Sequence, residues 1–309
     1  MLKGTKAKNI TILKKINKYR SLYLMLIPAI LLLAIFSYAP MFGVIIGFKD
    51  LNPRLGVFGS PWADPALKYF MQLFGDSKFW SVLWDTVWIS FLRLIFGFPV
   101  PVILALLYNE IRNQKFKRFS QTVLYLPYFL SWVVLAGIFK TIFLNEGSFN
   151  ILLKNLGLSP VPFLTSRSHF LPFLVISDIW KNMGFSSIIY LAAISGIDNS
   201  LYEAADIDGA GRFSKMRYIT LPSIAVAISI NLILQTSNIL NGGFDQIYNL
   251  DTTGTFYDII DTYLYRIAFV EGANYSLATA LGLFKSVVGF VIIIITNKIA
   301  NKLGDAGIW

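Results

Sequence analysis

Cysteine is absent from the 309 residues, and histidine occurs once, as His169. These absences exclude disulfides, thiolate zinc sites, cysteine nucleophiles and histidine metal clusters. Charged residues make up only 14% of the chain and hydrophobic residues 55%, whereas soluble domains carry about 25% charged residues. This composition predicts a membrane protein. The phosphate-cradling pattern GxxxxGK[ST] is also missing, since Gly282 and Lys285-Ser286 have the wrong spacing, so the chain is not predicted to bind ATP itself.

The net charge of +10 is concentrated in short segments beside apolar runs. Such a distribution is the orientation signal of a membrane protein and does not indicate a nucleic-acid partner. Residues 1–21 form a basic tail without acidic residues. The tail does not resemble a secretory signal peptide, because the apolar segment after it is too long and lacks a cleavage site.

Six apolar segments are long enough to cross about 30 Å of hydrocarbon. They are residues 22–48, 80–108, 121–143, 170–196, 222–243 and 275–299. With six spans, one side of the membrane holds the tail 1–21, the loop containing Arg112 and Lys115, the loop 198–222 and the tail 300–309. The lysines and arginines of these segments make that side cytoplasmic. The prediction is an all-α integral membrane protein with both termini inside.

The regions between spans differ in composition. Segment 49–79, predicted to lie outside, is rich in glycine, proline and aromatic residues, which favours turns over a long helix. Segment 144–169 contains a short amphipathic patch that ends at Gly157, and 244–274 is acidic on balance. Residues 80–299 would then form a core of five spans behind the first span, 22–48.

The loop from Glu203 to Pro222 reads EAADIDGAGRFSKMRYITLP. Asp198 or Asn199 is suited to cap a short helix at its start. Ala204 and Ala205 would leave a shallow surface for a partner, and Gly209 permits the positive φ that ends such a helix. The sequence therefore predicts a capped helix of about two turns at a membrane face.

The order EAA, three residues, Gly, nine residues, Ile, one residue, Leu-Pro resembles the EAA loop of ABC-importer permeases. The resemblance implies a type I (MetI-like) bundle in which this loop is a coupling helix, seated in a groove of an ATP-hydrolysing subunit. The residues that it would assign to ATPase coupling are Glu203, Ala204, Ala205, Asp208, Gly209, Leu221 and Pro222.

The same resemblance implies the partners. They are a second permease, as a heterodimer, two ATP-binding cassette subunits that hold ATP and magnesium, and an extracytoplasmic solute-binding protein. This chain would bind no cofactor or metal, perform no bond chemistry and lie in the bacterial cytoplasmic (inner) membrane.

Further stretches are similar to the polysaccharide and oligosaccharide permeases of that family. They are YAPMFGVIIGFKDLNP, GSPW, DIWKNMGFSSIIYLAAISGID and the end at Trp309. Several members of that subgroup take up uronate-containing oligosaccharides, so the resemblance implies an acidic sugar as substrate.

Four amides, Asn231, Gln235, Asn238 and Asn241, recur at helical spacing in and just beyond the fifth span, which predicts that they share one face. Unsatisfied amides are costly in lipid, so this face must meet protein or water. Two interpretations remain open: a path for a hydroxyl-rich solute, or hydrogen bonds between helices.

Charged and aromatic residues within spans complete the candidate set. Asp178 and Lys181 form either a functional pair or a structural ion pair, and Arg93, Lys140 and Lys285 have no obvious local partner, although Asp85 lies two turns before Arg93. Rings such as Trp132 and Phe185 would either stack on sugar faces or pack. The candidates for the substrate pathway are Asn231, Gln235, Asn238, Asn241, Trp180, Lys181, Tyr190 and Lys285.

Two rival functions fit the sequence less well. A secondary transporter could use an ion gradient through Asp178 and Lys181, but it would have no use for an EAA loop. An integral membrane enzyme lacks support, because the sequence offers no metal-ligand cluster and no nucleophile beside a histidine base.

Overall fold

The computed structural model describes residues 18–251 and 256–304, which are mostly helical. Within these ranges strand-like pairing is limited to a bridge between Lys49 and Trp62. The helices are α2 (Arg20–Leu33), α3 (Ala39–Met41), α4 (Gly56–Gly59), α5 (Lys68–Gly75), α6 (Ser77–Leu92), α7 (Pro99–Glu110), α8 (Gln114–Tyr125), α9 (Trp132–Phe143), α10 (Ser148–Asn155), α11 (Arg167–Ser195), α12 (Asn199–Ile207), α13 (Arg212–Lys215), α14 (Leu221–Ser223), α15 (Ala225–Ser237), α16 (Phe244–Leu250), α17 (Ile260–Phe269) and α18 (Tyr275–Gly304). Five turns of π or 3-10 type join them: η1 (Ala34–Tyr38), η2 (Phe42–Phe48), η3 (Arg93–Gly97), η4 (Leu126–Phe129) and η5 (Met216–Thr220).

Three helical stretches in the described ranges are long and apolar enough to cross a membrane: Arg20–Phe48, Ser77–Glu110 and Tyr275–Asn301. Two bent helix pairs, Gln114–Phe129 with Trp132–Asn155 and Arg212–Ser223 with Ala225–Ser237, raise the number to five if each pair is one span. Helix α11 has 29 residues but is more polar and is not among these candidates.

The predicted span 121–143 is not one continuous helix. The chain bends by 101° between Phe129 and Trp132. Pro127 has no N–H to continue a helix, and the Ser131 side chain instead caps α9 by accepting a hydrogen bond from the Val134 N–H. Both residues were visible in the sequence as helix-break signals.

The predicted fifth span, 222–243, is also interrupted. Its helix α15 starts at Ala225, after a 59° bend, and ends at Ser237. Asn238 and Asn241 therefore lie in the turn after the helix, ahead of Gly243, whose φ is +84°. The four amides do not form one continuous helical stripe.

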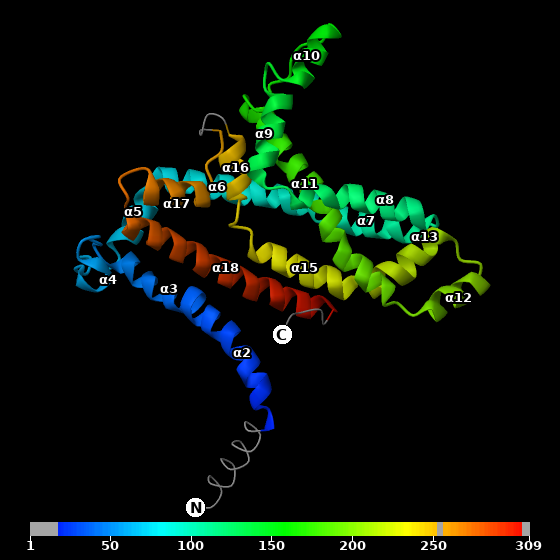
Figure 1. Cartoon of the computed structure of the whole chain (residues 1–309), viewed down its shortest axis with the longest axis horizontal. Helices are drawn as coiled ribbons and strands as arrows, with labels where there is room; N and C mark the ends of the chain where they lie inside the picture. The colour runs from blue at the N-terminus through cyan, green and yellow to red at the C-terminus, as the bar shows by residue number, and fades with distance from the viewer. Residues whose placement is uncertain (1–17, 252–255, 305–309) are drawn as a thin grey trace, which may run out of the picture.

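The long helices lie side by side, with α11 packed on α7, and α18 packed on both α15 and η2 (Figure 1). Helix α12 marks one end of the molecule, whereas α4, α5 and α17 gather at the opposite end. Helices α9 and α10 project one after the other to one side of this bundle, where α16 packs against α9.

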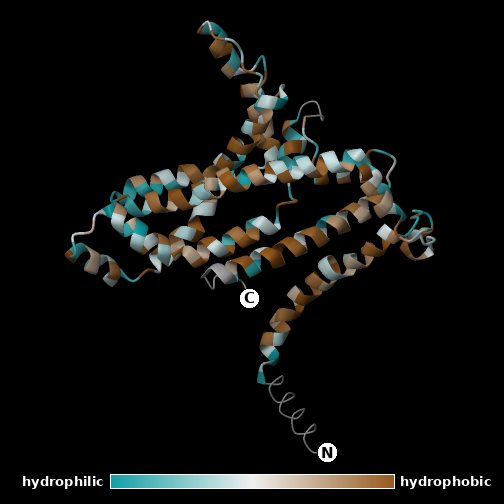
Figure 2. Ribbon diagram, turned by 180° about the vertical axis from the view of Figure 1, so that it is seen from behind, coloured by the Kyte–Doolittle hydropathy of each residue, from teal (hydrophilic) through white to brown (hydrophobic). Residues whose placement is uncertain are grey.

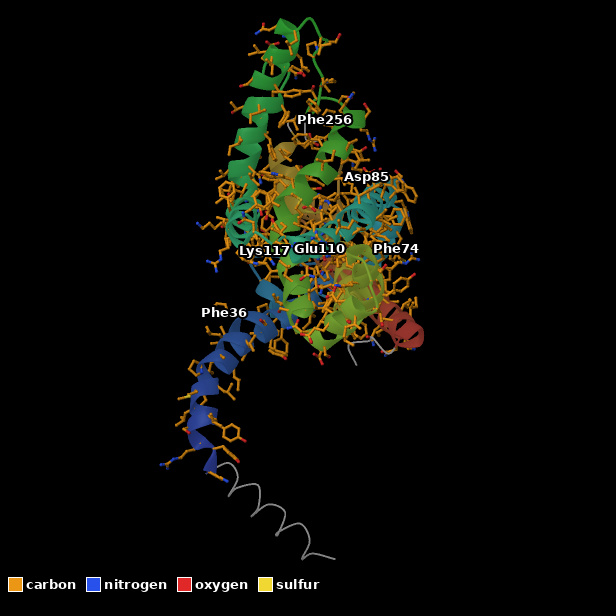
Figure 3. The ribbon with its side chains drawn as sticks, turned by 90° about the vertical axis from the view of Figure 1, so that its right-hand side faces the viewer. Phe36, Phe74, Asp85, Glu110, Lys117 and Phe256 are labelled. Atoms are coloured by element: carbon orange, nitrogen blue, oxygen red, sulfur yellow. The ribbon has the colours of Figure 1, made fainter. Side chains whose placement is uncertain are left out.

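Helix α2 stands apart from the bundle, as the view with Phe36 labelled shows (Figure 3). None of its residues is buried, and hydrophobic residues cover both α2 and α18 (Figure 2). Apolar surface of this extent suits contact with lipid or with another membrane subunit.

Candidate functional site

Helix α12 is built as the sequence predicts. At its start the Asp198 carboxylate accepts a hydrogen bond from the Ser200 N–H at 2.9 Å, and this bond holds the pKa of Asp198 below its usual range. At its end Gly209 has a φ of +73°. The Gly209 and Ala210 N–H groups donate to the carbonyls of Asp206 and Ala205 at 3.1 and 2.9 Å, which satisfies carbonyls that the helix end would leave unpaired.

The loop around α12 is fastened to the rest of the chain by polar contacts. The Tyr202 hydroxyl lies 2.9 Å from the Thr220 hydroxyl, and Lys215 pairs with Asp206. Leu221 and Pro222 lie in α14, outside α12, with the proline in the first turn. These contacts give the loop a defined shape.

The outer face of this loop is open. Glu203, Ala204 and Gly209 are exposed, and Ile207 and Phe213 present 88% and 70% of their surface. Apolar side chains this exposed beside polar ones are typical of a protein contact.

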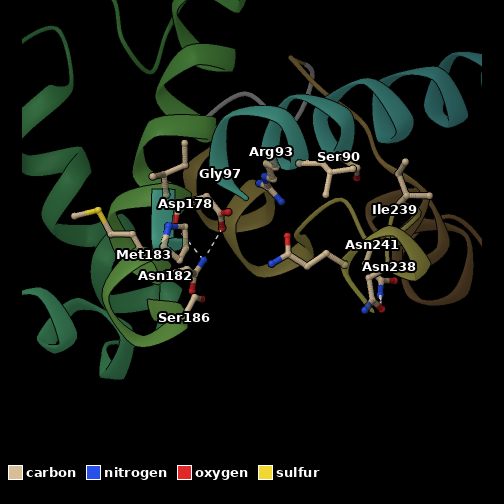
Figure 4. A pocket seen from close by; sticks show the side chains of 14 residues that line it. Ser90, Arg93, Gly97, Asp178, Asn182, Met183, Ser186, Asn238, Ile239 and Asn241 are labelled. Atoms are coloured by element: carbon tan, nitrogen blue, oxygen red, sulfur yellow. Dashed lines mark hydrogen bonds between the residues drawn. The ribbon is translucent and has the colours of Figure 1, made fainter. Parts of the chain in front are cut away.

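A polar cavity of about 320 Å³ lies between η3 with the end of α6, the middle of α11 and the turn after α15 (Figure 4). Gln235, Asn238 and Asn241 from the predicted set line it. Asn231 is not among the lining residues, and its amide donates to the Ala227 carbonyl one turn earlier at 2.9 Å. The other polar residues of the lining are Ser90, Arg93, Asp178, Asn182 and Ser186.

Arg93 joins the cavity wall to the chain that follows α15. One guanidinium N–H donates to the Gly242 carbonyl at 2.7 Å, and another donates to the Gln246 side chain. A Cβ added at Gly243 would lie 2.2 Å from the Arg93 Nη1 and would displace the guanidinium, and the φ of +84° at this position also favours glycine. Arg93 opens the π-helical turn η3, a deviation from α-helix that is frequent at functional sites.

The position of Gln246 is fixed in turn by α11. Its amide donates to the Leu174 carbonyl at 2.8 Å and to the Ser177 hydroxyl at 2.9 Å. The Nε of Arg93 is buried and has no hydrogen-bond partner among the described residues. A buried charged group without a full set of partners is costly, and this donor has no surface open to the cavity in this conformation.

The predicted ion pair of Asp178 and Lys181 is not what holds either residue. Asp178 accepts a hydrogen bond from the Asn182 amide at 3.0 Å and lines the cavity. The Lys181 ammonium donates to the carbonyls of Pro127, Tyr128 and Leu130 at 3.3, 2.8 and 2.6 Å. Lys181 therefore satisfies the carbonyls freed where the chain bends before α9, and it does not line the cavity.

The other candidates also lie outside this cavity. Tyr190 is 2% exposed and packs with Val102 and Ile224. Trp180 lines a second, apolar cavity of about 480 Å³ with Phe139 and Phe173. The structure thus gives these two rings packing partners elsewhere.

Two charged residues of the predicted spans find partners on distant elements. Lys285 pairs with Asp261 of α17, and Asp85 pairs with Arg167 at 3.4 Å, not with Arg93. Sequence reasoning missed the cavity residues Ser90, Asn182 and Ser186. Asp178, Asn182 and Ser186 follow one another at intervals of four residues. The helical spacing used for the amides would therefore have placed Asn182 and Ser186 on one face with Asp178.

Residues 97–305 match the family of binding-protein-dependent transport system inner membrane components. The chain belongs to this family. It is accordingly a multi-pass inner-membrane protein of the ABC-transporter permease class with a MetI-like fold.

Two relatives from Bacillus subtilis support this assignment over nearly the full length. The chain is 40% identical over 307 residues to the polygalacturonan/rhamnogalacturonan transport system permease protein YteP of Bacillus subtilis. The aligned region covers 98% of this chain and 95% of the relative. It is 41% identical over 308 residues to protein LplB of the same organism, covering 99% and 96%.

The fold matches a solved transporter equally well. A chain in the crystal structure of a bacterial ABC transporter involved in the import of the acidic polysaccharide alginate superposes with a TM-score of 0.86 and 38% identity, covering 95% of this chain and 99% of that one. A second structure of a bacterial alginate ABC transporter, in complex with an alginate pentasaccharide-bound periplasmic protein, gives a TM-score of 0.85 at 38% identity, covering 96% and 99%.

Replacing Arg93 with lysine is expected to loosen the turn at 241–246. A single ammonium cannot reproduce the fork that reaches both Gly242 and Gln246, and loss of one charged hydrogen bond costs about 1.5–3 kcal/mol. Because the chain lacks cysteine, an Asn241→Cys reporter measures the change as its rate of labelling by a maleimide. The rate should rise in the Arg93→Lys background and stay constant with the exposed control Arg112→Lys. Equal rates in all three backgrounds would contradict this role for Arg93.

Proposed function

We propose that this chain is one of two permease subunits of an ATP-driven, binding-protein-dependent importer of oligosaccharides, and that the substrate carries uronate groups. One observation supports this best: α11 connects the polar cavity to the exposed helix α12. Its middle carries Asp178 and Asn182 in the cavity wall, and its end leads through Gly196 to Asp198, the cap of α12. A push on α12 would therefore be transmitted to the cavity wall.

The proposed topology has six spans with both termini inside. It counts α11 as a span together with the three long apolar stretches and the two bent pairs. The core 80–299 then carries α12 on the cytoplasmic side with the basic loop near Arg112, and segments 49–79, 144–169 and 244–274 lie outside. Lysine and arginine on the inner loops support this orientation.

An acidic oligosaccharide suits the chemistry of the cavity. Gln235, Asn238 and Asn241 offer amides to sugar hydroxyls, and the positive charge of Arg93 in the cavity wall would attract a carboxylate. Asp178 can accept from hydroxyls. The names of the relatives point the same way, since they refer to polygalacturonan, rhamnogalacturonan and alginate.

In the proposed cycle this chain performs no bond chemistry. ATP and magnesium would bind to the two ATPase partners, and their closure would push on the coupling residues of loop 203–222. With the second permease the chain would enclose a pathway that opens alternately to either side. A solute-binding protein would deliver the sugar from outside.

Reconstitution tests this function. The chain is reconstituted in proteoliposomes with its second permease, its ATPases and the binding protein. With ATP enclosed in the lumen, where the ATPases lie, the vesicles should accumulate galacturonate oligosaccharides. They should take up neutral galacto-oligosaccharides less well. The chain alone should accumulate neither under a proton or sodium gradient. Accumulation by the chain alone would establish the rival, a secondary carrier.

A further inference from the structure

Five aromatic rings form a continuous row on the face made by α16, α17 and the start of α18. Successive ring centroids are 5.1 Å apart from Phe244 to Tyr248, 5.2 Å to Tyr265, 5.5 Å to Phe269 and 6.4 Å to Tyr275. We call this row the aromatic ladder. Three of its rings are exposed, since Tyr248 presents 51% of its surface, Phe269 67% and Tyr275 37%, whereas Phe244 and Tyr265 are half-buried.

The aromatic ladder starts beside the polar cavity. Asn241 lines the cavity, and only the Gly242-Gly243 turn held by Arg93 separates it from Phe244. The other end of the ladder, at Tyr275, lies at the start of α18, at the end of the molecule opposite α12 (Figure 1). The ladder therefore leads from the outer end of the bundle to the rim of the cavity.

Polar groups flank these rings. A pocket of about 270 Å³ is lined by Tyr248 and Tyr265 together with Asp258, Thr262 and Arg266, among others. Asp258 pairs with Arg266 and accepts a hydrogen bond from the Thr262 hydroxyl at 2.7 Å. Lys78 also pairs with Asp258, at 3.3 Å. The Asp258 carboxylate is thus paired with two cations, and Asp251 brings a second carboxylate to the pocket.

This combination fits a sugar better than it fits lipid. A pyranose ring has an apolar face, which packs on an aromatic ring, and a rim of hydroxyls, which needs donors and acceptors. Acyl chains would leave the charged groups of the pocket in an apolar surrounding at high cost. The aromatic rings and the ion-paired pocket together match the two sides of a carbohydrate chain.

The cavity is also small for an oligosaccharide. Its volume of about 320 Å³ lies at the lower end of small-molecule pockets, which span about 300–1,000 Å³. A chain of several sugar rings whose first rings occupy the cavity must extend beyond it. The aromatic ladder is the surface that continues from the cavity rim.

We propose that the aromatic ladder is an outer binding track that holds the trailing rings of an oligosaccharide by stacking while its leading rings enter the cavity. The proposal rests on the function proposed above and adds a determinant of chain length. Short substrates fit within the cavity and do not use the track, whereas long substrates do.

The test compares substrates of two lengths in the assembled transporter. Tyr248→Leu and Phe269→Leu keep an apolar side chain but remove the flat ring, and Tyr248→Phe keeps the ring. We expect the KM for galacturonate hexasaccharide uptake to rise roughly two- to tenfold in each leucine variant, the loss of one aromatic contact, with the KM for the disaccharide unchanged. Tyr248→Phe should behave as wild type for both lengths.

A matched control lies on α6, where Trp84 and Trp88 also stack in the open, with centroids 6.3 Å apart. Neither residue lines the cavity, so Trp84→Leu should leave both KM values unchanged.

Equal length dependence in wild type and leucine variants overturns the track. Leucine variants that no longer co-purify with the second permease would show a subunit interface instead, and lower insertion at constant KM would show a lipid contact. If wild type itself imports neither substrate, the proposed function fails and not the track alone.

Discussion

Replacing Gly209 with valine is expected to abolish ATP-driven uptake while leaving the chain inserted in the membrane. The φ of +73° at this position costs an L-residue about 1–2 kcal/mol, and a β-branched residue tolerates it least. No atom lies within 4 Å of a Cβ built at Gly209, so the effect comes from the backbone and not from a clash. Relief of this strain moves the end of α12, and solute-stimulated ATPase activity should fall at least roughly tenfold.

Gly157 offers a matched control, because it has the same φ of +73° and equally empty surroundings but follows α10, on the side proposed to be outside. Gly157→Val should therefore stay coupled. Glu203→Lys, which reverses an exposed charge of α12, should uncouple transport as Gly209→Val does. Equal ATPase stimulation in the Gly209 and Gly157 variants would remove the coupling role of this loop.

Helix α12 was predictable because its signals are local. A cap at Asp198, small residues at the centre and glycine at Gly209 all act within a few residues of one another. The family resemblance rested on the same stretch, and the match of residues 97–305 confirms it. Docking on an ATPase stays a prediction.

The cavity was predictable only in part, because its wall is assembled from three elements. The amide spacing correctly brought Gln235 and Asn238 together, but it assumed that α15 continues. The helix ends at Ser237, where Thr236 and Ser237 turn their hydroxyls back onto helix carbonyls, a competition that weakens helices.

Charged residues in the spans were the least predictable feature. An i, i+3 spacing favoured an ion pair of Asp178 and Lys181, yet the acceptors of Lys181 are backbone carbonyls 51–54 residues earlier in the chain. Lys285 and Arg93 likewise find partners on other elements. Such contacts depend on tertiary packing, which helical periodicity does not describe.

A substitution near Lys181, where α11 contacts the end of α8, is expected to have the largest effect on folding. Gly184 lies one turn further along α11, where a Cβ would be 2.1 Å from the Leu124 carbonyl oxygen and 2.6 Å from its carbon. The backbones of α11 and α8 therefore touch, and no flexible side chain can move aside. Gly184→Ala must separate the two helices, and Gly184→Val must separate them further, at a cost of about 1–3 kcal/mol or more for overpacking.

The separation also draws Lys181 away from the carbonyls of Tyr128 and Leu130. Unpaired carbonyls are costly in a membrane, so the two losses reinforce each other. We expect Gly184→Ala to lower the thermal unfolding midpoint of the purified transporter and Gly184→Val to yield little inserted protein. Gly137 in α9 has no atom within 4 Å of its Cβ position, so Gly137→Ala should be neutral or stabilising by up to about 1 kcal/mol. Equal midpoints for the two alanine variants would show that α8 and α11 do not meet at Gly184.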